Sequence, residues 1–448
     1  MITNSRSIEL TQRFDKLYPA GHSNFRIRWD TTDHKVFMDR ASGCRVWDVD
    51  GNEYVDFMCG YGPTLLGHNH PRYVAALTEH IATSATTYGS SILFTEDDIA
   101  VAEKLVRHIP CAEAVKFHIT GSEAVQMAVR LARAHTGKDK IVRFEHHYHG
   151  WFDNVLGGML NPDRTGEPNV FQRSDTDPLS DPEFTLGKTP YWTQDSYMLP
   201  WNDFEALEAC FANYHQNIAL IHFEGIVFNH CGLYPKPGFL ERIRELCDQH
   251  NVVMSMDEII TGFRVGLGGA QGLLGVTPDI ATFGKSIGGG LPVSCLVGRA
   301  DLFEVMKGNI TLGPGTFNGY ALSVKAVKTT LEILEEDDGA AYRRLSALTE
   351  RLADGAASIA QDCAAPMAVT SATGALCFVF GVPGGRARLH TEADVAGFSA
   401  ASAKRFQREM EQRGVIMMAN GRSYLSLAHT EDDIDFFLEK MRAVLSGW

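Results

Sequence analysis

Three consecutive segments between residues 217 and 258 constrain the fold of this chain more than any other feature. They read "NIALIHFE", "PGFLERIRELCDQH" and "NVVMSMDE". The first and third are short and apolar almost throughout, and the middle one has the spacing of an amphipathic helix. Short apolar strands that alternate with such a helix are typical of a parallel sheet covered on both faces. We therefore expect an α/β fold.

The alternation of strands and helices extends through much of the chain. Upstream, the residue pattern predicts a helix over 99–109, a strand over 114–119, a helix over 124–137 and a strand over 140–144. Downstream, residues 322–336 carry one long amphipathic pattern that predicts a helix. In a doubly wound sheet of this kind, ligands bind beyond the carboxyl ends of the strands.

The length of 448 residues implies more than one domain, because a single hydrophobic core stops growing at about 250–300 residues. Near the N-terminus, "GCRVWDVDGNEYVDF" predicts a hairpin that turns at Asp50-Gly51. Near the C-terminus, a strand over 375–382 and a helix over 433–445 predict an α+β layer. We expect an N-terminal arm and hairpin over residues 1–60, a large domain over 61–324 and a small domain over 325–448.

The composition excludes several classes of partner and site. A net charge of −14 argues against nucleic acid and anionic membranes, which both need basic surface. The nine cysteines contain no C-x-x-C pair, which argues against a zinc motif and favours a reducing compartment. The chain begins without an apolar signal segment and has no apolar run of the ~18 residues that a membrane helix needs. We therefore expect a cytoplasmic protein.

Polar residues end three of the predicted apolar strands. They are Glu224, Asp257 and, just after "IATF", Lys285. Asp257 and Lys285 are separated by enough chain for one crossover between parallel strands, so both are expected to face one crevice. For an isolated pair of this kind, a salt bridge that merely caps the sheet is the favoured interpretation. A string of glycines after Lys285 leaves room for a large group to approach the backbone.

The segment "HITGSEAVQMAV" adds an anion site to this edge. A strand ends there, Thr120-Gly121-Ser122 turns, and a helix begins, which exposes free N–H groups beside two hydroxyls. A plain helix cap with Glu123 in the first turn is the alternative. The segment matches neither of the glycine-rich nucleotide motifs. A phosphate site, a strand-end carboxylate and a lysine among glycines together suggest pyridoxal 5′-phosphate, with the lysine as its Schiff-base partner.

The chain resembles the class III aminotransferases of fold type I, most closely the glutamate-1-semialdehyde 2,1-aminomutase-like branch. The stretches that carry the resemblance are "GSEAVQMAVRLARAHTGKDKIVRFEHHYHG", "KPGFLERIRELCDQHNVVMSMDEIITGFRVGLGGAQG" and "TPDIATFGKSIGGGLPV". The resemblance implies a large domain with a mainly parallel, seven-stranded type of sheet and a smaller α+β C-terminal domain. It also implies a homodimer with shared active sites.

The resemblance assigns four residues to the cofactor's ring. Lys285 matches the Schiff-base lysine, and Asp257 matches the residue that binds the pyridine nitrogen. Ile259 matches the side chain that packs on one face of the ring, and its spacing of two from Asp257 places it on the same side of a strand. Tyr148, in "HHYHG", matches the aromatic residue stacked on the other face.

Three histidines around Tyr148 leave a metal site open as an alternative. They are His146, His147 and His149. Further ligands are lacking near them in the sequence, and a protein metal site normally needs three or four. We therefore expect no metal.

Five more residues match cofactor contacts of the family. Gly121 and Ser122 match the phosphate turn, although this chain has T-G-S where the family usually has S-G-T. Glu224 and Asn229, in "FEGIVFNHCG", match a glutamate and an asparagine near the cofactor's phenolic oxygen. Thr316, in "PGTFNGYA", matches a threonine that one subunit supplies to the phosphate of the other.

The segments that resemble substrate-binding regions depart from the aminomutase pattern. The N-terminal "AGHSNFR" is one residue short, and it places Arg26 or Arg28 where a carboxylate could bind. The glutamate that precedes "S-L-A-H-T" in that branch is missing, and Arg422 lies in the shortened loop. Residues 152–190 are longer and more charged than a compact glycine- and serine-rich lid.

All of these departures lie in segments that resemble substrate-binding regions, and the residues that match cofactor contacts are retained. We therefore expect an aminotransferase that moves an amino group from a donor, with glutamate expected, to an aldehyde or ketone, leaving pyridoxamine 5′-phosphate between the two halves of the reaction. Amino sugars and aminocyclitols are one candidate class of acceptor. The alternative is a glutamate-1-semialdehyde 2,1-aminomutase, which moves the amino group within one substrate.

Overall fold

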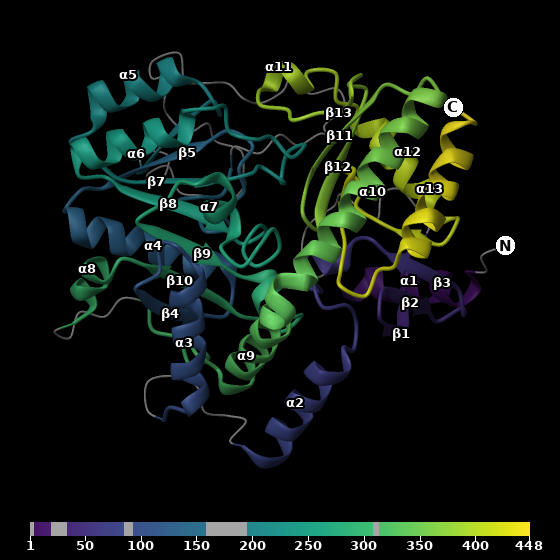
Figure 1. Cartoon of the computed structure of the whole chain (residues 1–448), viewed down its shortest axis with the longest axis horizontal. Coiled ribbons are helices and arrows are strands. Elements are labelled where there is room, and N and C mark those ends of the chain that lie inside the picture. The colour runs from purple at the N-terminus through teal and green to yellow at the C-terminus, as the bar shows by residue number, and fades with distance from the viewer. Residues whose placement is uncertain (1–3, 19–33, 85–92, 158–194, 308–312) are drawn as a thin grey trace. The chain divides into compact units, whose positions relative to one another are not determined.

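The structure, a computed structural model, describes residues 4–18, 34–84, 93–157, 195–307 and 313–448 (Figure 1). The chain forms two compact units. Ala75–Asp338 make up the larger unit, and Met1–Val74 together with Gly339–Trp448 make up the smaller one. The divisions thus fall at Val74 and Asp338, whereas the domain boundaries proposed from the sequence lie at residues 60 and 324.

The larger unit is built on a seven-stranded sheet. Its strands, in spatial order, are β4 (Ala114–His118), β10 (Ser294–Gly298), β9 (Ile280–Phe283), β8 (Val253–Glu258), β7 (Ile218–Glu224), β5 (Lys140–Phe144) and β6 (Ser196–Leu199). The ladders from β9 to β6 are parallel, and β10 runs antiparallel to both of its neighbours. The predicted, mainly parallel sheet is confirmed. The antiparallel strand β10 was not predicted.

Helices cover both faces of this sheet. The helices from this part of the chain are α3 (Glu96–His108), α4 (Gly121–Thr136), α5 (Phe204–Tyr214), α6 (Phe239–His250), α7 (Gly269–Leu274), α8 (Ala300–Phe303) and α9 (Ala321–Glu335), with 3₁₀ helices η4 (Lys285–Gly288), η5 (Glu304–Met306) and η6 (Glu336–Gly339). Helix α2 (Pro71–Thr83) contains the division at Val74. Figure 1 shows α4 and α6 on opposite sides of β7 and β8.

The core of the larger unit lies between α4 and the sheet. Helix α4 carries a buried apolar stripe that includes Val125, Ala128 and Leu131, and it packs against Leu220 of β7 and Val253 of β8. Burying a side chain of the size of valine or leucine contributes about 1.5–3 kcal/mol. This packing fixes the N-terminus of α4 relative to the carboxyl ends of the parallel strands.

The smaller unit contains two four-stranded sheets. One has the order β1 (Met38–Ser42), β2 (Arg45–Asp48), β3 (Glu53–Asp56) and β14 (Val415–Ile416), and the other has the order β13 (Gly385–Arg386), β11 (Met367–Ala372), β12 (Ala375–Phe380) and β15 (Arg422–Tyr424). Its helices are α1 (Ser5–Leu17), η2 (Cys59–Tyr61), α10 (Ala340–Asp362), α11 (Glu392–Val395), α12 (Ala400–Glu411) and α13 (Glu431–Leu445). The predicted strand over 375–382 and helix over 433–445 correspond to β12 and α13.

A strand pairing is one of the contacts that join the two ends of the chain in the smaller unit. Strand β14 lies parallel to β3, with Val415 opposite Val55. The predicted hairpin forms as β2 and β3, with Val46 opposite Tyr54. Its loop is longer than a two-residue turn, because the carboxylate of Asp48 accepts hydrogen bonds from the backbone of both Asp50 and Asn52, at 3.0 and 2.8 Å.

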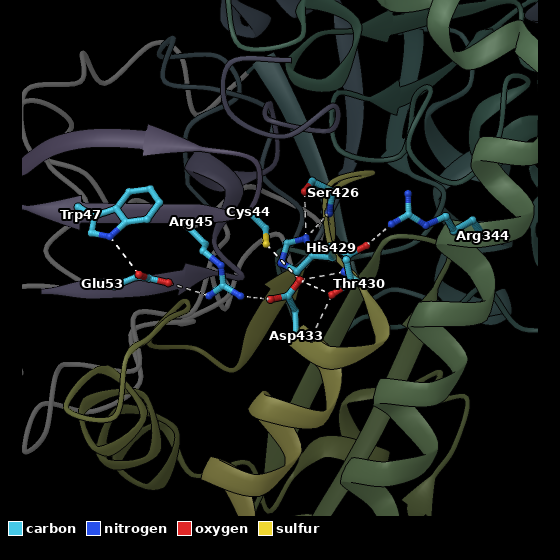
Figure 2. Close-up of polar contacts among 9 residues, drawn as sticks. All are labelled: Cys44, Arg45, Trp47, Glu53, Arg344, Ser426, His429, Thr430 and Asp433. Atoms are coloured by element: carbon cyan, nitrogen blue, oxygen red, sulfur yellow. Dashed lines mark hydrogen bonds and ion pairs between the residues drawn. The ribbon is translucent and has the colours of Figure 1, made fainter. Parts of the chain in front are cut away.

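A buried carboxylate joins the hairpin to the last helix within this unit. Asp433 accepts hydrogen bonds from the backbone and hydroxyl of Thr430, at 2.9 and 2.8 Å, which caps α13. Arg45 pairs with it at 2.7 Å, and the thiol of Cys44 lies 3.3 Å away (Figure 2). Two residues of the segment "SLAHT" thus have structural roles in this unit: His429 is fully buried, and Thr430 is the N-cap of α13.

All nine cysteines are present as thiols and not in disulfides. Among the helices of the described residues, none combines the length and the apolar character needed to cross a membrane.

We expect that Thr430→Ala destabilises the protein by about 1 kcal/mol, because the substitution removes an N-cap that closes a capping box with Asp433. Urea unfolding measures the loss. The matched control is Thr391→Ala, which removes the same type of capping box from α11, a helix of only 4 residues. An equal or larger loss for Thr391→Ala would contradict the importance of the α13 cap.

Candidate functional site

Asp257 and Lys285 lie at the same edge of the large sheet. Asp257 is near the carboxyl end of β8, and Lys285 follows β9, the next strand in the sheet. The two strands are parallel, and Asp257 is opposite Thr282, three residues before the lysine. Lys285 is half-buried, and its backbone φ of +46° lies in the left-handed region. Conformations of this kind in residues other than glycine concentrate at functional sites.

The carboxylate of Asp257 is buried and held by three groups. The Nδ1 atom of His149 lies 2.8 Å from Oδ2, and Nε2 of His222 lies 3.6 Å from the same oxygen. The backbone N–H of Ile259 donates to Oδ1 at 3.0 Å. Burial alone would raise the pKa of Asp257, but the interactions of the carboxylate with the two imidazoles lower it well below its usual value. The carboxylate therefore stays ionised and can bind a protonated nitrogen.

The histidines around Tyr148 face different partners. His149 contacts Asp257, His147 accepts a hydrogen bond from the backbone N–H of Glu224 at 2.9 Å, and His146 stacks on His230 with ring centroids 4.2 Å apart. They therefore do not converge on one metal. The ligand atoms of His149, His222 and Asp257 do lie within 4.8 Å of one another. A metal ion there would have to replace the hydrogen bond between His149 and Asp257.

Ile259 brings the helix turn and the lysine segment together. A Cβ atom on Gly121 would lie 3.0 Å from Cδ1 of Ile259, and a Cβ atom on Gly284 would lie 3.0 Å from the same atom. A larger residue at either position would press on the isoleucine side chain, and glycine avoids this. The start of α4, the residue after β8 and the residue before Lys285 therefore line one small volume.

The N-terminus of α4 has the properties of an anion site. Thr120 is its N-cap and forms a capping box with Glu123, so the cap interpretation is correct for these two residues. Among the described residues, the backbone N–H groups of Gly121 and Ser122 have no acceptor. The Ser122 hydroxyl accepts from the backbone of Trp151 at 3.2 Å, which leaves its own proton available. Three donors at a helix start suit a phosphate.

Glu224 connects the other predicted contacts. Its Oε1 atom accepts a hydrogen bond from the backbone of Tyr148 at 2.8 Å and from the amide of Asn229 at 2.9 Å. Tyr148 is half-buried, and both burial and the nearby charge of Asp257 raise the pKa of its phenol. The segment after Tyr148 approaches Ser122 closely, because a Cβ atom on Gly150 would lie 2.4 Å from the serine hydroxyl.

These residues fit pyridoxal 5′-phosphate by the chemistry of their donor sets. An ionised, buried carboxylate suits the ring nitrogen, and the helix start suits the phosphate. The hydroxyl of Thr282 is buried beside Asp257 and makes no hydrogen bond within the described part of the chain. Such an unsatisfied group is expected where a ligand completes the site.

The structure describes two of the remaining predicted residues, Thr316 and Arg422. Thr316 lies in an exposed turn of the larger unit. Arg422 belongs to β15 of the smaller unit, where it is buried, donates to the sulfur of Met418 at 3.3 Å and stacks over Tyr424. Arg26, Arg28 and residues 158–190 of the predicted lid lie outside the described residues.

The chain is similar to known aminotransferases and aminomutases in sequence and in fold. The sequence profile of the family "Aminotransferase class-III" matches residues 28–445. "Glutamate-1-semialdehyde 2,1-aminomutase 2" of Brevibacillus brevis is 33% identical over 98% of this chain and 97% of its own length. An omega-transaminase from Sphaerobacter thermophilus superposes with a TM-score of 0.85 at 26% identity, covering 98% of this chain and 97% of that one.

A third relative shares the fold. It is a glutamate-1-semialdehyde-aminomutase from Pseudomonas aeruginosa, solved in complex with PMP, with a TM-score of 0.84 at 23% identity over 98% of this chain and 94% of that one.

We expect the stability of the protein to fall as the pH decreases from 6.5 toward 4, in part because of His149. Burial and the neighbouring His222 lower the pKa of His149 from its usual 6.5 to about 4. The unfolded chain therefore gains a proton in this window that the folded chain does not, which costs up to about 1.4 kcal/mol per pH unit.

The measurement is urea unfolding at several pH values for the wild type and for His149→Asn, whose amide does not titrate. The variant should show a shallower slope, and the matched control His135→Asn, on α4, should keep the wild-type slope. Parallel slopes for wild type and His149→Asn would contradict the burial of a neutral imidazole.

Proposed function

We propose that this chain, a member of the class III family of pyridoxal-phosphate-dependent aminotransferases, moves an amino group from an amino donor to an aldehyde or ketone. Its mostly parallel, seven-stranded sheet has the fold of the type I transferases, as predicted from the sequence. Glutamate is the donor that we propose. The observation that carries the proposal is the buried carboxylate of Asp257, flanked by two imidazoles, on the strand beside the one that leads to Lys285.

We assign the cofactor to the residues of this edge. Lys285 would hold it covalently through Nζ, and Asp257 would accept the proton of its ring nitrogen. Gly121 and Ser122 would bind its phosphate, and Tyr148 and Ile259 would flank its ring. Glu224 and Asn229 are joined by a hydrogen bond and would lie near its phenolic oxygen.

The reaction needs a proton moved within the site. When bound, pyridoxal 5′-phosphate supplies an electron sink for the charge that develops at the donor's α-carbon. Lys285 is the base and acid that we assign to that proton, because its amine, once free, would be the group in the site able to accept and return it. Asp257 would support the electron sink by keeping the ring nitrogen charged.

We also propose a homodimer in which Thr316 of the partner subunit completes the phosphate site. Within one chain Thr316 is exposed, and its neighbour Phe317 is 57% exposed. An exposed phenylalanine beside a hydroxyl is consistent with a surface that a second copy covers.

The acceptor is a small carbonyl compound in this proposal, and the acidic surface leaves amino sugars and aminocyclitols as candidates. The nine free thiols support a reducing, cytoplasmic location.

The second candidate function is that of a glutamate-1-semialdehyde 2,1-aminomutase. The 33% identity with the Brevibacillus brevis aminomutase favours it. The substrate segments favour transfer between two substrates instead, since the glutamate before "SLAHT" is missing and the N-terminal segment is one residue short. An aminomutase has to retain its substrate while the amino group moves, and those segments are where retention would be built.

We expect borohydride to attach the cofactor irreversibly to Lys285. Reduction traps a covalent bond between the lysine amine and the cofactor's aldehyde carbon, and peptide mass spectrometry locates the added mass. Lys285→Ala should abolish the attachment, whereas Lys116→Ala, which removes a half-buried lysine of β4, should leave it unchanged. An adduct on a lysine other than Lys285 would refute the assignment.

We expect incubation with an amino donor to release its keto acid and to leave pyridoxamine 5′-phosphate, which a carbonyl acceptor then returns to the aldehyde form. Chromatography of the keto acid and the loss of visible absorbance measure this half-reaction over a panel of donors. Conversion of glutamate 1-semialdehyde to 5-aminolevulinate without any release of keto acid would establish the aminomutase instead.

A further inference from the structure

A second imidazole faces Asp257 from the interior of the sheet. His222 of β7 and Ser255 of β8 are opposite each other in the parallel ladder, and both are fully buried. Nδ1 of His222 lies 2.8 Å from the hydroxyl oxygen of Ser255, and its Nε2 lies 3.6 Å from Oδ2 of Asp257. Ser255 and Asp257 are two residues apart on one strand, so their side chains project from the same face.

This polar pair is unusual for its surroundings. Every residue of β7 and of β8 is buried. An apolar side chain would fill such a position without the cost of removing an imidazole and a hydroxyl from water. Within the described residues, Nε2 of His222 makes no hydrogen bond. The histidine is thus satisfied on one side only, and its other nitrogen points toward the carboxylate.

The hydrogen bond to Ser255 is compatible with either tautomer of His222, and the charge of Asp257 decides between them. The hydroxyl can donate to Nδ1, and in that arrangement the ring proton is on Nε2, directed toward the oxygen of Asp257. The opposite tautomer would point a lone pair at an anion. Since His149 approaches the same oxygen at 2.8 Å, two imidazoles stabilise one negative charge, and their ring centroids are 4.2 Å apart.

We propose that His222, oriented by Ser255, is a positioning residue that keeps Asp257 anionic when the carboxylate binds the cofactor's ring nitrogen. The inference rests on the proposed function. A proton shared between Asp257 and the ring nitrogen stays on whichever group holds it more strongly. An N–H directed at the carboxylate lowers the proton affinity of Asp257, so the proton remains on the nitrogen.

The test uses the full-length holoenzyme, loaded with pyridoxal 5′-phosphate labelled with ¹⁵N in the ring. The ¹⁵N chemical shift reports directly whether that nitrogen carries a proton. We expect the protonated value in the wild type and a shift toward the unprotonated value in His222→Leu. Ser255→Ala should produce a smaller shift in the same direction, because it frees the imidazole to rotate. His222→Gln should restore part of the wild-type value, since its amide can still donate.

A second readout is the dissociation constant of pyridoxamine 5′-phosphate, measured by calorimetry on the cofactor-free protein. It should rise about tenfold in His222→Leu, the size of effect expected for losing one interaction with a charged group. The matched control is His118→Leu, which removes a buried imidazole from β4 at the far edge of the sheet. It should change neither readout.

The outcomes are distinguishable. If the wild type does not bind the cofactor, the proposed function fails and this inference fails with it. If the wild type binds it with a protonated nitrogen, but His222→Leu and Ser255→Ala keep that shift, then His222 only fills space and the inference alone is wrong. Should His222→Leu not fold, Ser255→Ala decides the question by itself.

Discussion

The negative charge of Asp257, buried beneath the edge of the large sheet, is the constraint on which the candidate site depends. An isolated carboxylate in such surroundings would take up a proton, because burial favours its neutral form. Here the charge is maintained by side chains from three places: His149 after β5, His222 on β7 and the backbone that follows β8. The strand order β8–β7–β5 brings these groups together. The order of the strands therefore determines which groups stabilise the charge of Asp257.

Close packing fixes the distance between the start of α4 and the segment before Lys285. Glycine at positions 121 and 284 allows the start of α4 and the segment before Lys285 to meet at the side chain of Ile259. Helix α4 cannot move away from this contact without breaking its packing against β7 and β8. A phosphate bound at the helix start and a ring bound over Asp257 would consequently be held at a fixed separation, which is what a rigid cofactor requires.

Much of this arrangement could be predicted from the sequence, since apolar strands with polar ends identify the edge of a parallel sheet. Asp257, Lys285 and the turn at Gly121 were found in this way, and the structure places them at one edge. His222 and Ser255 could not be found, because single polar residues inside buried strands resemble ordinary core positions until the register of the ladder is known. Strand β10 and the pairing of β14 with β3 were also not predicted. Both depend on pairing between distant segments of the chain, which local sequence patterns do not reveal.

The most direct test of this account is a crystal structure of the protein grown with pyridoxal 5′-phosphate. The account predicts continuous density from the Nζ atom of Lys285 to the cofactor, a ring nitrogen about 2.8 Å from a carboxylate oxygen of Asp257, and a phosphate at the N–H groups of Gly121 and Ser122. A cofactor bound elsewhere, or a ring nitrogen directed away from Asp257, would contradict the account.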